Sequence, residues 1–76
     1  MALLTSIKRV SKPRQRVHKP VECGASTFEH DGVLYLQLDT YGTRERQDVG
    51  DVSQSLQMDR EAALQLRELI DATFAT

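Results

Sequence analysis

The chain has 76 residues, one cysteine and a net charge of −1, so it has room for one small domain and cannot form an internal disulfide. A domain of this size buries only about 60% of the surface of its unfolded chain and is marginally stable alone. Small domains without disulfides or metal commonly associate with a second subunit. We therefore expect a homodimer.

The single cysteine, Cys23, is typical of a protein in a reducing compartment. At the start of the chain the apolar residues precede the basic ones, whereas a secretory signal has the reverse order. No apolar run approaches the roughly 20 residues that a membrane span needs. We expect a cytoplasmic protein with no membrane partner.

The charges are segregated along the chain. Residues 1–20, which we call the arm, carry six basic side chains and no acidic one, whereas residues 21–76, the body, carry all eleven acidic side chains. A segment of this kind indicates a polyanionic partner, most often nucleic acid. The arm's basic residues are Lys8, Arg9, Lys12, Arg14, Arg16 and Lys19.

The structure of the arm is open from the sequence. Pro13 and Pro20 disfavour a helix, and the density of charge is typical of a mobile tail. Alternatively, its apolar residues form one short amphipathic turn or a strand that docks elsewhere. These residues are Ala2, Leu3, Leu4, Ile7 and Val10.

The body predicts an α+β domain, in which an antiparallel meander of three to four strands precedes one C-terminal helix. Residues 21–30 alternate weakly, as a strand does, and Asp31-Gly32 favours the positive φ angles of a tight hairpin. Residues 33–41 form the clearest strand. Leu34, Leu36 and Leu38 fall on one face, and Tyr35, Gln37, Asp39 and Tyr41 on the other.

The second half of the body predicts a loop, a strand and the helix. Residues 42–51 carry two glycines and five charges, which is typical of a loop, and a strand follows at 52–58. Asp59 is the expected N-cap of a helix that runs to about Phe74. We expect this helix to pack on the leucine side of the sheet. The expected core contains Leu34, Leu36, Leu38, Leu56, Leu66 and Ile70.

This order of elements resembles a known family. Gly32-Val-Leu-Tyr-Leu-Gln-Leu-Asp, a charged loop, a last strand that ends in Leu-Gln-Met-Asp59 and a terminal helix are similar to the single-stranded-DNA-binding domain of positive-cofactor-4 type transcriptional coactivators. The resemblance covers about residues 27–72. It implies a four-stranded sheet, a dimer formed through the helices and DNA contact by the loop arginines Arg44 and Arg46.

A second motif resembles small bacterial and phage proteins of unassigned function. It runs Tyr35-Leu-Gln-Leu-Asp-Thr-Tyr-Gly-Thr-Arg44 and continues with Ser53-Gln-Ser-Leu-Gln. This resemblance implies no chemistry.

Groups that could carry catalysis or bind a metal are few. Cys23 with His18 or His30 could form a thiolate pair, but Cys23 lies among small residues, where a buried and inert thiol is expected. The three residues have no zinc spacing and no fourth ligand. We expect a non-enzymatic protein with no catalytic residue, no metal and no cofactor.

The candidate nucleic-acid site combines the arm cations with four residues of the body. Arg44 and Arg46 offer fork-shaped donors to phosphate, and Tyr35 and Tyr41 offer ring faces on which bases stack without sequence choice. The alternatives are a solvated mixed-charge loop for the arginines, and sheet covering or a subunit interface for the tyrosines.

Two functions follow from these features. The leading hypothesis is a small module that binds single-stranded DNA or RNA through the basic arm and the open sheet face. The rival is a phage or bacterial accessory subunit that docks on a larger protein assembly. The acidic body favours the rival, because its net negative charge repels a nucleic-acid backbone.

Overall fold

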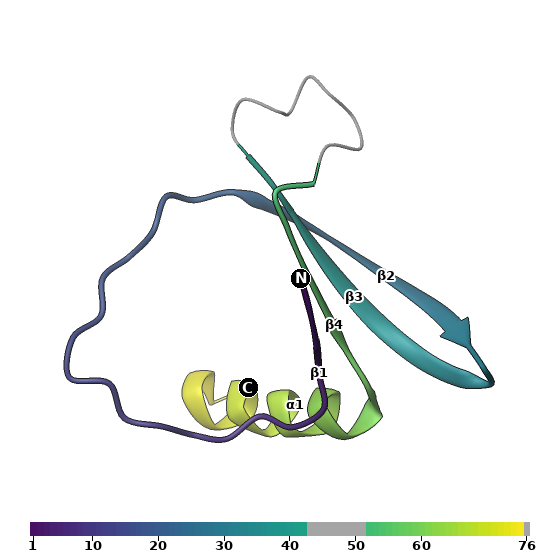
Figure 1. Cartoon of the computed structure of the whole chain (residues 1–76). Coiled ribbons are helices and arrows are strands. Elements are labelled where there is room, and N and C mark those ends of the chain that lie inside the picture. The colour runs from purple at the N-terminus through teal and green to yellow at the C-terminus, as the bar shows by residue number, and fades with distance from the viewer. Residues whose placement is uncertain (43–51, 76) are drawn as a thin grey trace.

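The computed structural model describes residues 1–42 and 52–75 and contains a four-stranded mixed sheet with one C-terminal helix (Figure 1). The expected α+β fold is therefore confirmed. Arg44 and Arg46 lie outside the described residues. The elements are β1 (Ala2–Leu4), β2 (Glu22–His30), β3 (Val33–Tyr41), β4 (Gln54–Met58) and α1 (Arg60–Phe74).

Strands β2 and β3 form the hairpin that the Asp-Gly signal predicts. Asp31 has φ of 51° and Gly32 has φ of 77°, so both central residues of the turn have the positive φ of a type I′ turn. This turn matches the right-handed twist of the strands and fixes their register. Phe28 consequently pairs with Tyr35, and Glu22 pairs with Tyr41.

Strand β4 pairs antiparallel with β3 and aligns the apolar residues of the two strands. Leu36 is paired with Met58 and Leu38 with Leu56. Directly paired residues project to the same side of a sheet, so the alternation expected from the sequence is confirmed. We call the side that carries Leu34, Leu36, Leu38 and Leu56 the leucine face, and the opposite side the polar face.

The fourth strand comes from the first residues of the chain. Strand β1 pairs parallel with β4, with Ala2 beside Leu56, and gives the sheet order β1-β4-β3-β2. The backbone N–H of Asp59 donates to the carbonyl of Leu4 over 3.3 Å. The sequence left three possibilities for the apolar residues of the arm: a mobile tail, a short amphipathic turn or a docked strand. Leu3 and Leu4 adopt the docked strand.

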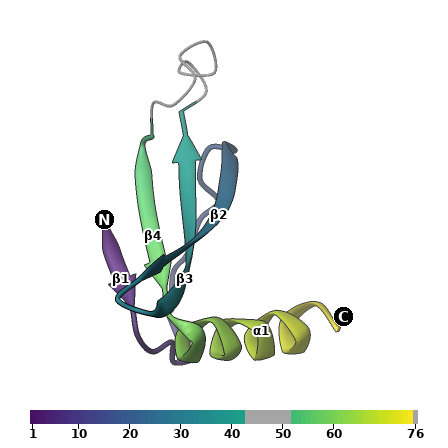
Figure 2. The same ribbon diagram turned by 90° about the vertical axis from the view of Figure 1, so that its right-hand side faces the viewer.

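Helix α1 begins immediately after β4 and leaves the sheet at its end (Figures 1 and 2). Asp59 is its N-cap, because its carboxylate accepts a hydrogen bond of 2.9 Å from the N–H of Ala62, and Ala75 closes it in the left-handed conformation. Only Asp59 separates β4 from α1, and beyond it the helix runs away from the sheet (Figure 2). The helix consequently meets the leucine face only at its first turns.

The core is smaller than the sequence pattern predicts. Among the described residues the buried apolar side chains are Met58, 2% exposed, and Ala62, fully buried where α1 meets the sheet. Leu34 is 64% exposed and Ile70 43% exposed, so the expected single core of strand and helix residues is wrong within one chain. The direction in which α1 leaves β4 is the reason.

The N-cap gives the first prediction. Replacing Asp59 by alanine removes the acceptor for the N–H of Ala62 and should lower the free energy of unfolding by about 1 kcal/mol. Asp59→Asn keeps a side-chain oxygen at the same position and should retain most of the stability. Urea denaturation measures both, and equal losses in the two variants would contradict the capping role.

Candidate functional site

The arm projects from the body on the side of the sheet on which α1 lies (Figure 1). After β1 it passes beside α1, where the N–H of Ile7 donates to Oε1 of Gln65 over 2.6 Å. It then forms a wide loop that returns to β2. Val17, five residues before β2, is 98% exposed.

The arm's cations are open to solvent. All six are exposed, and none forms an ion pair with a described residue of the body. Their charge is therefore not neutralised within that part of the molecule. Such cations can bind phosphate without first breaking an internal ion pair.

The polar face carries a chain of hydrogen bonds across β3 and β4. Gln57 donates through Nε2 to Oε1 of Gln37 over 2.9 Å, and Gln37 donates to both carboxylate oxygens of Asp39, over 2.9 and 3.2 Å. Ser55 donates to the same carboxylate. These groups orient one another, so the centre of the polar face presents fixed amide, hydroxyl and carboxylate groups.

Strand β1 lies beside this hydrogen-bond network and forms one side of a pocket. The pocket, of about 340 Å³, lies between the edge of β1 and the glutamines of the polar face. Its lining is Met1, Ala2, Leu3, Gln37, Ser55 and Gln57. The amides and the hydroxyl can form hydrogen bonds, but the negative charge of Asp39 beside them disfavours a phosphate here.

Two aromatic groups lie on the polar face at opposite ends of the hairpin. Near the turn, the rings of Phe28 and Tyr35 stack with centroids 5.3 Å apart and planes at 24°. At the other end, the ring of Tyr41 lies across Gly24, so closely that a Cβ on that glycine would be 2.9 Å from the tyrosine hydroxyl. Glycine at this position thus lets the Tyr41 ring lie along the sheet.

The structure brings some of the predicted site residues together and separates others. Tyr41 pairs with Glu22, and Lys19 precedes this pair by three residues, so the end of the arm lies near Tyr41. Tyr35 is six residues along the strand, which is about 20 Å. The middle of the arm lies on the side of the sheet on which α1 lies (Figure 1), whereas the register places both tyrosines on the polar face.

The groups considered for catalysis and metal binding do not converge. Cys23 and His30 occupy opposite ends of β2, about 23 Å apart along the strand. His30 instead lies 3.3 Å from the carboxylate of Asp31. Across residues 1–42 and 52–75 there is no cluster of three or more histidine, cysteine or acidic side chains that could hold a metal ion. Cys23 is exposed, so the expectation of a buried thiol is wrong, because the leucine face on which it lies is uncovered.

Two residues of the polar face were missed in the sequence. Phe28 was not assigned to a face, and the role of Gly24 under the Tyr41 ring was not predicted. The turn contained the signal for both. A two-residue turn at Asp31-Gly32 pairs His30 with Val33, and counting outward from that pair places Phe28 opposite Tyr35 and Gly24 opposite Asp39.

No helix in the described part of the chain is both long and apolar enough to cross a membrane. Searches of protein-family models, of curated proteins and of solved structures found no match to this chain. The two resemblances noted in the sequence therefore stay predictions, and the arm and the polar face are the features that bear on function.

Proposed function

We propose that this chain is a small non-enzymatic module that binds single-stranded nucleic acid in the cytoplasm as a homodimer. The observation that carries the proposal is the arm. It holds six exposed cations in a projecting loop, without an ion pair to a described residue of the body. Phosphates attract such a segment through long-range electrostatics and through the release of counterions.

The end of the arm supports contact with exposed bases as well. Tyr41 lies along the sheet over Gly24, close to the point where Lys19 leads into β2. A ring in this position offers its outer face to a base while a nearby lysine neutralises the adjacent phosphate. A stacked base requires an unpaired strand, which favours single-stranded over duplex nucleic acid.

The central experiment is a fluorescence polarisation assay with labelled single-stranded DNA, single-stranded RNA and duplex DNA, each at two salt concentrations. We expect the single strands to bind more tightly than the duplex and all affinities to fall steeply with salt. Absence of binding by the intact chain at low salt would reject the proposal. Equal binding of duplex and single strand would limit the interaction to phosphates.

Replacing Tyr41 by leucine tests the stacking platform. The substitution keeps an apolar side chain but removes the ring face, and it should weaken single-strand binding by about 1–3 kcal/mol. Tyr35→Leu is the matched control, because one face of that ring is already stacked on Phe28 and it lies far from the arm. Polarisation titrations of both variants decide the point, and an equal or larger loss for Tyr35→Leu would contradict the assignment.

The rival function is a protein-interaction subunit of bacterial or phage origin. The acidic body supports it, because eleven acidic side chains oppose the approach of a nucleic-acid backbone. An interface led by apolar contacts would change little with salt, so the same assay separates the two functions.

A further inference from the structure

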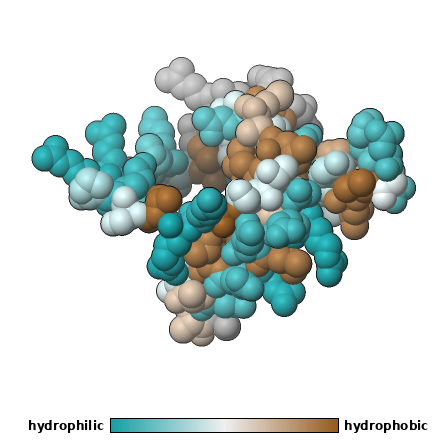
Figure 3. Space-filling model, turned by 60° about the horizontal axis from the view of Figure 1, so that its bottom comes forward, coloured by the Kyte–Doolittle hydropathy of each residue, from teal (hydrophilic) through white to brown (hydrophobic). Residues whose placement is uncertain are grey.

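The leucine face is largely uncovered. Leu34 in β3 is 64% exposed and Leu56 in β4 is 42% exposed. Both belong to the face on which leucine recurs at every second residue from Leu34 to Leu38. Figure 3 shows apolar side chains (brown) on the surface in the middle of the molecule, between hydrophilic side chains (teal) that include the projecting arm. An exposed apolar face of this kind indicates a binding surface.

Helix α1 carries a second uncovered apolar surface. Ala63, Ile70 and Phe74 recur at seven and four residues and therefore lie in one row along the helix. Ile70 is 43% exposed and Phe74 is 70% exposed. We call this row the helix ridge.

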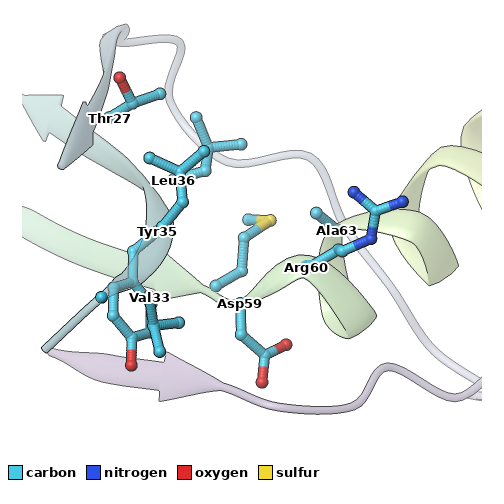
Figure 4. A pocket seen from close by; sticks show the side chains of 10 residues that line it. Thr27, Val33, Tyr35, Leu36, Asp59, Arg60 and Ala63 are labelled. Carbon is cyan, nitrogen blue, oxygen red and sulfur yellow. The ribbon is translucent and has the colours of Figure 1, made fainter. Parts of the chain in front are cut away.

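The helix ridge and the leucine face meet at an apolar corner. Ala63 of the ridge and Leu34, Leu36 and Met58 of the sheet line one open pocket of about 430 Å³, shown in Figure 4. The N-terminal end of the helix ridge therefore faces the same side of the molecule as the leucine face. The helix then runs away from the sheet (Figure 2), and Ile70 and Phe74 near its C-terminal end are exposed.

The exposed area is larger than that of a compact monomer of this mass. The chain exposes 6879 Å². A folded monomer of the same mass exposes about 4,700 Å², so the difference is roughly 2,200 Å². The projecting arm accounts for part of it. A permanent dimer removes at least about 1,000 Å² from each subunit, which this difference accommodates.

We propose that a second copy of this chain covers the leucine face, with the helix ridge of each copy packed on the leucine face of the other. The chain carries both halves of the contact, a broad apolar sheet and a narrow apolar helix, and Leu34, Ile70 and Phe74 stay exposed within one copy. A two-fold axis forms the same contact twice and covers both surfaces in both copies. The proposal rests on the homodimer named in the proposed function but not on nucleic-acid binding, and its test uses no nucleic acid.

The test is light scattering and sedimentation over a range of micromolar concentrations. We expect the intact chain to be dimeric and Ile70→Glu and Leu34→Glu each to weaken the dimer about 30-fold or more, because each places a charge in an apolar contact. Leu64→Glu is the matched control. Leu64 is 40% exposed on the same helix but lies about 120° around it from Ile70, so this variant should remain dimeric.

A separate measurement covers variants that fail to fold when the dimer is lost. The melting temperature of the unaltered chain should rise with protein concentration, as it does when folding and association are coupled. A monomeric mass with a melting temperature independent of concentration would overturn the proposal. The leucine face would then be a docking surface for a different protein. Dissociation by Leu64→Glu with a dimer retained in Ile70→Glu would overturn it too, because the contact would then lie elsewhere on the helix.

Discussion

Neutralising the arm is expected to abolish most of the salt dependence of nucleic-acid binding. Each phosphate that a cation neutralises on a single strand contributes about −0.7 to the slope of log affinity against log salt. With not all six arm cations engaged, the intact chain should show a slope of roughly −2 to −4. Replacing all six by glutamine should bring the slope close to zero and leave the fold intact, because these side chains are exposed.

A pair of double variants makes the comparison sharper. Arg14 and Arg16 are exposed in the arm, whereas Arg60 and Arg67 are exposed on α1. Changing the first pair to glutamine should reduce the slope by about 1.4, and changing the second pair should leave it unaltered. An unchanged slope in the arm variant would mean that Arg14 and Arg16 contact no phosphate, and would leave the other arm cations or Arg44 and Arg46 as the phosphate contacts.

Shortening Met58 is expected to have the largest effect on stability. Its side chain is 2% exposed and lies where β4, β3 and α1 meet, beside the buried Ala62. Met58→Ala should lower the free energy of unfolding by about 2–5 kcal/mol, since the cavity cannot be refilled from so small a core. Urea denaturation gives the value.

Val17→Ala is the control for Met58. Val17 is 98% exposed in the arm, so its loss should change stability by no more than about 0.5 kcal/mol. If Met58→Ala were as stable as this control, the junction of sheet and helix would not be the centre of the fold.

Local patterns predicted the elements well. The Asp31-Gly32 turn, the alternation of 33–41 and the cap at Asp59 each depend on neighbouring residues, and the structure confirms all three. The parallel pairing of β1 with β4 depends on contacts between residues distant in sequence. A stretch of only three apolar residues at the start of a charged arm is compatible with a mobile tail as well as with a strand. Deleting the arm from residue 2 would therefore remove a strand.

The packing of α1 could not be read from its periodicity. An apolar stripe shows that one side of a helix will be covered, but it does not identify the element that covers it. The stripe is consistent with packing on the leucine face of the same chain and with packing on the leucine face of a second copy. In this chain Asp59 is the single residue between β4 and α1, and the helix that follows runs away from its own sheet (Figure 2).

The same limit applies to the candidate site. Composition identified the arm, and alternation placed Tyr35 and Tyr41 on one face, as the register confirms. The length of β3 places the two tyrosines at opposite ends of the hairpin, and this could be predicted from the sequence. The path of the arm depends on the docking of β1 beside β4, which could not. The approach of Tyr41 to Gly24 requires side-chain positions.

The parallel edge strand has a consequence for the order in which the fold forms. The hairpin of β2 and β3 closes over two residues, whereas Ala2 and Leu56 lie more than fifty positions apart. The entropy lost in closing so long a loop is recovered only when β4 already has its place beside β3. Docking of β1 is therefore expected to be the last step of sheet assembly and its release the first step of unfolding, so amide hydrogens of β1 should exchange fastest among the four strands.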